Sequence, residues 1–510
     1  MNSLMRWMSA ATIAASLVLA MCVSSSPAAE TAPPSRPGPL RPNIVLIIAD
    51  DMGAEDWGGG GNPHVHTPNL DRLAKAGLSF RRAMLTCSSC SPSRSSTITS
   101  RYPHNTDAEQ LHWLLPAEQV TFVELLKQAG YYTAASGKWH LGNAVKDRFD
   151  TVDEASAAGF QLPADAAAAG QAVLEDRQNA SGCANWVKVL RERPRDKPFF
   201  MWFAALDPHR DYSPNIIAQP HQPADAIVPP YLPDTAQVRA DFAMYYDEIA
   251  RLDSFVGRVL DELDAQKVAG DTLVVFMSDN GRPFPRCKTT LYESGIRTPL
   301  VMRWPARIAA NKQCEALVSS VDLGVTFLEL ADVKPHANMQ GRSFASLLSD
   351  PAARHREFAF AEHNWHDYDA FERAVRSERF KYIRNLDATL PLTPPADAVR
   401  SPTFIDMRRL RDAGQLPQQQ SQCFVRPRAE EEFYDLQTDP HELQNLAAAA
   451  SLANDAVLAT ELARHRSALD AWRRETADLQ NVRAPDEFDR ESGAPLKARK
   501  RPRASKSSLK

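Results

Sequence analysis

The chain has little charge imbalance and no internal repeat, which excludes several classes of protein. Its 510 residues carry 59 Lys and Arg against 63 Asp and Glu, a net charge of -4, so nothing global indicates a nucleic-acid partner. After residue 23 no apolar stretch is long enough to cross a membrane. With 44% hydrophobic and 24% charged residues, the composition is that of an ordinary globular protein. The length allows one large domain and a smaller one.

Cysteine is also scarce, at seven residues in the whole chain. Scattered cysteines in a chain of this size do not make a disulfide framework. No Cys-x-x-Cys pair recurs at the spacing of a zinc site. Cys87 and Cys90 form one such pair, but no second feature supports a redox function. We expect Cys87 to be structural.

The N-terminus has the pattern of a secretory signal. A positive residue precedes an apolar run over residues 7–23, and small residues follow as far as Ala29. A retained membrane anchor is the alternative, but the run is short for a span of about 20 residues. A lipoprotein site at Cys22 is disfavoured by the bulky methionine before it. We therefore expect a signal peptide over 1–29, a linker over 30–41, no stable membrane span after cleavage, and a periplasmic or extracellular location.

Buried strands alternate with helical patterns in the first two thirds of the chain. Thr121–Ala129 is helical up to Gly130, and a long amphipathic segment places apolar residues from Phe242 to Leu263 on one face. This alternation predicts an α/β fold with a mostly parallel sheet flanked by helices. The predicted strands are Ile44–Ala49, Tyr131–Ser136, Phe199–Leu206 and Thr272–Met277.

Each of these four strands leads into polar residues. In open parallel sheets, ligands bind beyond the carboxyl ends of the strands. One such cluster would be a turn or a cap, but four together predict a site. The clusters are Asp50 with Asp51, Lys138 with His140, Asp207 with His209, and Asp279 with Asn280.

The pattern changes towards the C-terminus. We expect a catalytic domain over 42–348, a smaller α+β domain over 349–480, and a disordered basic tail over 481–510. The smaller domain is predicted from short strand-like runs and one helix with apolar residues at helical spacing. These are Glu357–Ala361, Phe380–Ile383, and a helix carrying Leu458, Leu462, Leu469 and Trp472.

The most informative motif is Cys90-Ser91-Pro92-Ser93-Arg94, followed by Arg101-Tyr102-Pro103. It resembles the signature of the type I sulfatases. One departure is Ser100, where the extended signature has glycine. Further motifs stand in that family's order, and the resemblance covers residues 42–475. They are Asn43 to Gly53, Gly137-Lys138-Trp139-His140-Leu141-Gly142, Asp207-Pro208-His209, Ser278-Asp279-Asn280-Gly281, and Lys288 with Tyr292 to Pro299.

The resemblance implies an alkaline-phosphatase-like fold and a modified nucleophile. In this family an export-linked formylglycine-generating enzyme oxidises the cysteine, here Cys90, to an aldehyde. Carboxylate and amide oxygens suit calcium or magnesium better than zinc, and the family uses calcium. The implied metal ligands are Asp50, Asp51, Cys90, Asp279 and Asn280. The implied catalytic residues are Cys90, Arg94, Lys138, His140, His209 and Lys288.

The chemistry follows from the charge of a sulfate ester. Positive side chains would surround its oxygens, and one hydroxyl of the hydrated aldehyde would attack sulfur. The second hydroxyl then allows sulfate to leave, which a thiol could not do. His209 or Lys288 is expected to protonate the leaving group, and His140 to assist the nucleophile.

Several further segments stand out, namely Asp207 to Arg210, Val228 to Tyr231, Arg282 to Pro285 and Ser401 to Phe404. They look like segments of the heparan N-sulfatases (sulfamidases). N-sulfoglucosamine of heparan sulfate or heparin is therefore the expected substrate. Against it, Lys288 stands where the sulfamidases have Arg, so an O-sulfatase acting on aryl, 6-O or 2-O sulfates remains open. A phosphodiesterase or phosphonate hydrolase and a sugar-binding protein without catalysis are further alternatives. The candidate substrate residues are Asp207, Arg210, His363, His366 and Arg373.

Overall fold

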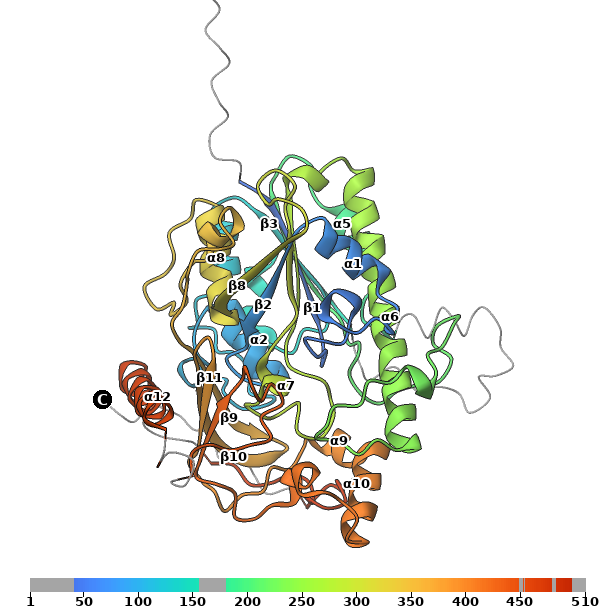
Figure 1. The fold of residues 1–510 in the computed structure, drawn as a ribbon. Helices are drawn as coiled ribbons and strands as arrows, with labels where there is room; N and C mark the ends of the chain where they lie inside the picture. Colours follow the sequence, from blue (N-terminus) through green and yellow to red (C-terminus); the bar gives the residue numbers. More distant parts are fainter. Residues whose placement is uncertain (1–40, 156–179, 449–452, 454, 479–482, 498–510) are drawn as a thin grey trace, which may run out of the picture. The chain divides into compact units, whose positions relative to one another are not determined.

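The computed structural model describes residues 41–155, 180–448, 453, 455–478 and 483–497. The expected signal peptide therefore lies outside the described residues, as does the linker apart from its last residue. The described chain contains an eight-stranded sheet and a four-stranded sheet (Figure 1).

The larger sheet has the strand order β4-β3-β5-β1-β6-β7-β2-β8. Every neighbouring pair is parallel except those made by β7, which runs antiparallel to β6 and β2. The four predicted strands lie together as β3, β5, β1 and β6. The strands are β1 (Asn43–Ala49), β2 (Leu78–Met84), β3 (Tyr132–Gly137), β4 (Thr151–Glu154), β5 (Phe199–Ala204), β6 (Thr272–Ser278), β7 (Leu300–Arg303) and β8 (Lys312–Ser319).

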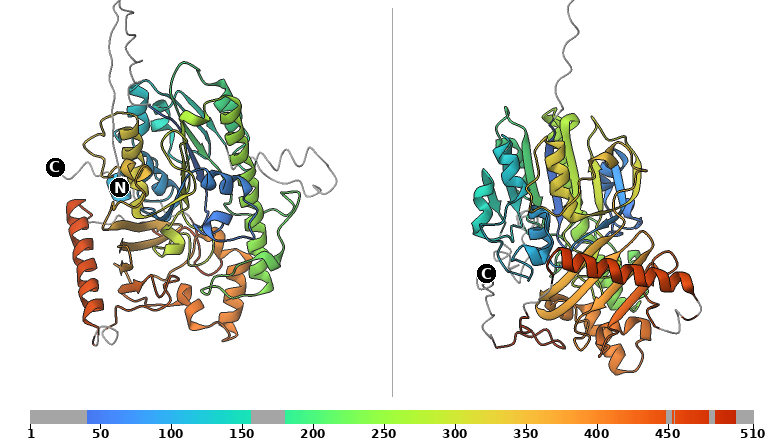
Figure 2. Two further views of the ribbon diagram at one scale, coloured as in Figure 1. Left: turned by 45° about the horizontal axis from the view of Figure 1, so that its top comes forward. Right: turned by 90° about the vertical axis from the view of Figure 1, so that its left-hand side faces the viewer.

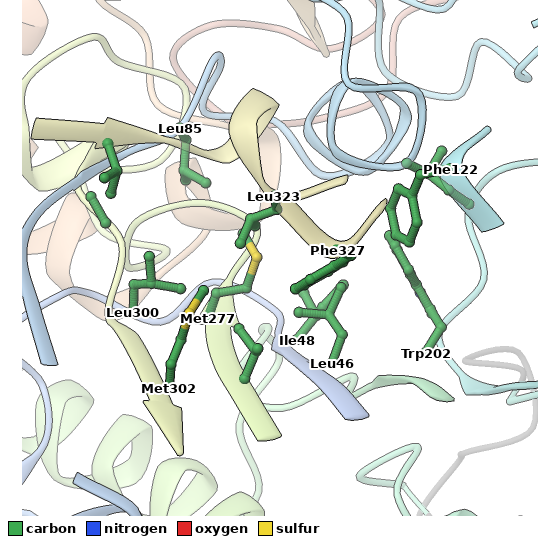
Figure 3. Packing of buried hydrophobic residues seen from close by; sticks show 14 of the residues in the cluster. Leu46, Ile48, Leu85, Phe122, Trp202, Met277, Leu300, Met302, Leu323 and Phe327 are labelled. Atoms are coloured by element: carbon green, nitrogen blue, oxygen red, sulfur yellow. The ribbon is translucent and has the colours of Figure 1, made fainter. Parts of the chain in front are cut away.

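Both faces of this sheet are buried, which explains why its central strands are continuous apolar runs. Successive side chains of a strand point to opposite faces. On β1, Leu46 and Ile48 belong to one apolar cluster, whereas Val45 and Ile47 belong to another. Figure 3 shows the first cluster, in which Leu46 and Ile48 lie near Phe327.

Helices cover both faces of the sheet (Figure 1). The side chains of α1, α5 and α6 belong to the cluster on one face, and those of α2, α3 and α8 to the cluster on the other. The amphipathic face predicted from Phe242 to Leu263 is buried on α6. The bounds are α1 (Pro68–Lys75), α2 (Cys90–Thr99), α3 (Phe122–Gln128), α5 (Trp186–Glu192), α6 (Ala236–Ala265), α7 (Glu293–Ile296) and α8 (Leu323–Leu330).

The C-terminal part forms the second sheet, which is antiparallel with the order β12-β11-β10-β9. The long helix α12 lies across it, burying Leu462, Leu469 and Trp472 (Figure 2). A mostly parallel α/β sheet with a smaller α+β part confirms the predicted fold class. The elements are β9 (Ala359–His366), β10 (Tyr368–Arg376), β11 (Phe380–Asn385), α9 (Ala396–Val399), α10 (Pro402–Asp412), β12 (Glu431–Asp435) and α12 (Ala456–Glu475).

The expected disordered tail over 481–510 needs correction for residues 483–497, which pack on the second sheet. Trp365 donates a hydrogen bond from Nε1 to the carbonyl of Pro485 at 3.1 Å, and Arg483 pairs with Asp369. Ala484 is buried in the same place. These contacts supply burial and ion pairing that the basic composition did not reveal. Within the described part of the chain, no helix is both long and apolar enough to span a membrane.

Candidate active site

Cys90 occupies the first position of α2, next to the carboxyl end of β1. Its Sγ lies 3.4 Å from Oδ1 of Asp50 and 3.8 Å from Oδ1 of Asp51. The thiol is almost inaccessible, because the residue is only 2% exposed. The carboxyl ends of parallel strands meet at one edge, and this edge brings the polar residues after β1, β3 and β6 around Cys90.

Three buried carboxylates at this edge are each paired with a cation. Lys138 donates to Asp50, and Lys288 Nζ donates to Asp51 Oδ2 at 2.7 Å. Arg94, one helical turn after Cys90, donates from Nε to Asp279 Oδ2 at 2.8 Å. Buried carboxylates need such partners, since an unpaired charge would carry a large desolvation cost.

The same residues fit a divalent cation. One ligand atom from each of Asp50, Asp51, Cys90 and Asp279 can be chosen so that all lie within 4.8 Å of one another. Asn280 donates from Nδ2 to Asp51, while its buried Oδ1 has no hydrogen-bond partner among the described residues. Rotation of the amide by 180° would turn that oxygen towards the carboxylates. A cluster of acidic oxygens with one orphaned amide oxygen suits a hard cation.

The crowding of like charges shifts several pKa values. Burial together with the nearby Asp50 raises the pKa of Asp279 to about 6. At Asp50 burial acts in the same direction, but Lys138 and other cations outweigh it and lower the pKa. Burial and the carboxylate of Asp50 raise the pKa of the Cys90 thiol well above its ordinary range. The unmodified thiol is therefore protonated and a poor nucleophile.

His209 lies at the partly open side of the site, with its side chain 32% exposed. Its Nδ1 is hydrogen-bonded to the carbonyl of Arg210. A carbonyl only accepts, so Nδ1 donates and Nε2 is the atom that faces the site. Nε2 lies 3.7 Å from Asp51 and 3.7 Å from Asp397.

His140 reaches the site from the segment after β3. Its buried Nδ1 has no hydrogen-bond partner among the described residues, and its ring lies 5.1 Å from that of His112. Burial lowers the pKa of His140 well below the ordinary value, and the nearby Lys138 and His112 lower it further. A neutral imidazole of this kind can accept a proton.

Three of the candidate substrate residues have charged groups that are paired within the protein. Asp207 accepts hydrogen bonds from Arg251 at 2.9 and 2.6 Å. Arg210 is paired with Asp241, and Arg373 donates to Asp478 at 2.7 Å through both Nε and Nη2. All three are buried. These ion pairs position the chain, and a contact of the three residues with a sugar stays a prediction.

The two histidines of β9 differ in their surroundings. His366 Nδ1 lies 2.8 Å from Oγ of Ser89, the residue before Cys90, and burial with the nearby Lys288 lowers its pKa well below the ordinary value. His366 is thus beside the site. His363 is buried, and the charges that act on it are Arg428 and Arg373.

Asp397 is a site residue that the sequence interpretation did not identify. It lies in α9, its side chain is 16% exposed, and its carboxylate is 3.9 Å from Lys288 Nζ. The signal that could have found it is the nearby Ser401 to Phe404 segment, which begins four residues later. Nothing within α9 itself marks an aspartate as functional.

The fold and this constellation define a hydrolase of the alkaline-phosphatase-like class. A family model of the sulfatases matches residues 42–333, and one described as N-sulphoglucosamine sulphohydrolase, C-terminal, matches residues 286–389. The chain belongs to the sulfatase family. It is accordingly a hydrolase of sulfuric esters or sulfamates, as expected from the Cys90 motif.

Relatives support this placement. The chain is 32% identical over 485 residues to N-sulphoglucosamine sulphohydrolase of Homo sapiens, covering 87% of this chain and 92% of that protein. It is 29% identical over 497 residues to an ulvan-active sulfatase of Formosa agariphila, covering 87% and 76%. A protein solved in complex with its substrate D-glucosamine-2-N,6-O-disulfate has the same fold, with a TM-score of 0.63 at 20% identity over 88% of this chain and 100% of that one.

Proposed function

We propose that this chain is a calcium-dependent sulfatase that releases the N-sulfate of N-sulfoglucosamine in heparan sulfate or heparin, with a formylglycine derived from Cys90. The observation that carries the proposal is the position of Cys90. It lies between Asp50 and Asp51 at the start of a buried helix, with Arg94, Lys138 and Lys288 each paired to a carboxylate of the same cluster.

Calcium would be held by oxygens of Asp50, Asp51, Asp279 and Asn280 together with the side chain at position 90. When bound, it would supply positive charge to a sulfate oxygen and to the nucleophile. Lys138, Lys288 and Arg94 would add fixed positive charge around the remaining sulfate oxygens. The orphaned Oδ1 of Asn280 supports the ligand set.

Formylglycine in its hydrated form would supply a hydroxyl nucleophile and a second hydroxyl for the release of sulfate. His140 would accept a proton beside the nucleophile, since its buried Nδ1 has no hydrogen-bond partner among the described residues. His209 in its doubly protonated form would donate the proton of Nε2 to the leaving group, while Nδ1 keeps its hydrogen bond to a carbonyl. A positioned acid of this kind contributes about 10²–10⁴-fold to rate.

The proposed substrate rests on likeness to N-sulphoglucosamine sulphohydrolase along 87% of the chain, and on the C-terminal match. The site also suits a sulfate group on the terminal sugar of a saccharide. Cys90 is almost fully buried, while His209, Asp397 and Lys138 form a partly exposed rim at 32%, 16% and 12%. Lys288 favours the second candidate, an O-sulfatase, because the sulfamidases have Arg at this position. An ammonium group binds sulfate as a point charge, whereas a guanidinium group can form two parallel hydrogen bonds to it.

Maturation and location belong to the same proposal. A formylglycine-generating enzyme would modify Cys90 during export, and residues 1–29 would direct the chain to the periplasm or outside the cell. Residues 42–348 would form the catalytic domain, with 349–480 as the smaller domain.

The test is a comparison of kcat/KM on matched N-sulfated, 6-O-sulfated and 2-O-sulfated glucosamine saccharides. The proposal expects N-sulfate to be released fastest. Release of sulfate from O-linked positions alone would reject N-sulfoglucosamine as the substrate, but it would remain consistent with the sulfatase family. Lys288→Arg measured on the same set separates the contribution of this residue, and a phosphonate monoester in the panel tests the phosphonate hydrolase alternative.

A further inference from the structure

The carboxylate of Asp397 stands beside the expected proton donor of the reaction. Its Oδ2 lies 3.7 Å from Nε2 of His209 and 3.9 Å from Nζ of Lys288. The side chain is 16% exposed, which places it at the partly open rim. No motif of the sequence pointed to it.

Two hydrogen bonds from backbone amides fix α9, and one of them is accepted by this carboxylate. Within α9, the amide of Ala398 donates to Oδ1 of Asp397 at 2.7 Å. The amide of Ala396 donates to Asp367 at 2.9 Å, which fixes the start of the same short helix. An aspartate restrained in this way is positioned rather than free to turn into solvent.

Asp397 shares its cationic neighbours, Lys288 and His209, with Asp51. The three fixed cations already pair with other carboxylates, Lys138 with Asp50, Lys288 with Asp51, and Arg94 with Asp279. Asp397 is therefore an additional negative charge at the entrance of a site for an anionic group. Such an arrangement is unfavourable for the sulfate itself, unless another part of the substrate becomes positive.

We propose that Asp397 is the residue that favours a nitrogen leaving group over an oxygen leaving group, through attraction for the positive charge that the nitrogen acquires. This inference rests on the proposed N-sulfoglucosamine activity. It assigns the source of the specificity, which the proposed function leaves open.

The reaction supplies that charge. The doubly protonated ring of His209 gives the proton of Nε2 to the sulfamate nitrogen and becomes neutral with its proton on Nδ1. The nitrogen then carries two hydrogens and a positive charge while still bonded to sulfur. A hydroxyl of the hydrated formylglycine at position 90 loses its proton to His140 and forms a bond to sulfur. The sulfur–nitrogen bond breaks, and its electron pair stays on nitrogen as a neutral amine. The free amine then takes a second proton from water and becomes ammonium. Asp397 attracts the nitrogen in both charged states.

An O-sulfate gives the opposite electrostatics. Its leaving oxygen gains negative charge as the sulfur–oxygen bond breaks and is at most neutral after protonation. The carboxylate of Asp397 repels this negative charge on oxygen, whereas it attracts a cationic nitrogen in the same position. Asp397 thus stabilises the leaving group of an N-sulfate and destabilises the leaving group of an O-sulfate.

Asp397→Asn keeps the shape and removes the charge. We expect kcat/KM for N-sulfated glucosamine to fall by about tenfold or more relative to kcat/KM for the matched 6-O-sulfate, since unit charges about 4 Å apart near a protein surface interact strongly. Inhibition by the product D-glucosamine should weaken, whereas inhibition by neutral N-acetylglucosamine should not. Asp397→Glu, which restores the charge, should recover part of the preference for N-sulfate.

The control is Asp406→Asn on α10, where a carboxylate more buried than that of Asp397 accepts a hydrogen bond from Thr235 at 2.7 Å. It should leave the ratio of the two rates unchanged, and an equal shift there would overturn the assignment. Equal losses on both substrates in Asp397→Asn, or loss of bound calcium by elemental analysis, would also overturn it while leaving the proposed function intact. A wild-type enzyme without N-sulfate release would reject both.

Discussion

Arg210 donates two hydrogen bonds to the buried carboxylate of Asp241 on α6, from Nη1 at 2.8 Å and from Nη2 at 2.7 Å. Thr403 donates a third to the same carboxylate, at 2.6 Å. Arg210 follows His209, and Thr403 lies six residues after Asp397. One buried aspartate thus ties together the two segments that carry the expected proton donor and the rim carboxylate.

Asp241→Ala should therefore damage both stability and activity. Removing one partner leaves the Arg210 guanidinium buried and unpaired, which typically costs about 3–5 kcal/mol. Urea unfolding should show this loss, and kcat/KM should fall in the protein that remains folded. Asp261→Ala removes an exposed pair with Arg72 and is the control, since surface ion pairs contribute about 0–1 kcal/mol. Similar stability losses in both variants would contradict the role of Asp241 as an anchor.

The four adjacent strands β3, β5, β1 and β6, and the polar residues that follow them, were predictable because two signals coincided. β1, β5 and β6 are continuous apolar runs, a pattern specific to strands buried on both faces. Each leads directly into charged or amide residues, and the parallel arrangement brings those ends to one edge. Asp50 and Asp279 are more than 200 residues apart in the sequence, yet both contact Arg94.

The rest could not be predicted from local pattern. β2 alternates buried and exposed positions and contains two arginines, and β7 is only four residues long. The partners of charged residues could not be predicted either, because nothing in the sequence shows that Arg373 is paired with Asp478. Asp397 was missed for the converse reason, since a single aspartate in a proline-rich segment has no signature until the fold brings it to His209.

Cys90 should carry an aldehyde when the protein is produced together with a formylglycine-generating enzyme. Mass analysis of the peptide that contains residue 90 would detect the conversion. Cys90→Ala should abolish turnover but fold normally, because a small side chain at the start of α2 removes no ion pair of the cluster. Cys87→Ala is the matched control, three residues earlier and equally buried, and should keep activity. Full activity in Cys90→Ala would reject the proposed nucleophile.

One divalent cation should copurify with the protein, and Asp279→Asn should lose both the metal and the activity. The substitution keeps the volume of the side chain but removes a charged ligand and the partner of Arg94. Elemental analysis and thermal melting with and without a chelator would measure the effect, and added calcium should restore the melting temperature of the wild type. Stoichiometric zinc, or full activity in a metal-free sample, would contradict a calcium site.

His363 should make the protein sensitive to acid. Burial, with the positive charges of Arg428 and Arg373 nearby, lowers the pKa of His363 to about 3 in the folded protein. An unfolded histidine titrates near pH 6.5, so below that pH the unfolded chain binds a proton that the folded chain does not. Stability from this residue is complete above about pH 6.5 and is lost as the pH falls towards 3, by up to about 1.4 kcal/mol per unit.

His363→Asn removes the titrating group and tests this directly. The stability of the wild type relative to the variant should decrease between pH 6.5 and 4.5, measured as the free energy of unfolding in urea. Between pH 7 and 8.5 the difference between the two proteins should stay constant, because His363 is neutral in both the folded and the unfolded state, and this range serves as the internal control. Parallel stability curves down to pH 4.5 would show that His363 binds a proton in the folded protein, so that its burial beside Arg373 does not oppose protonation.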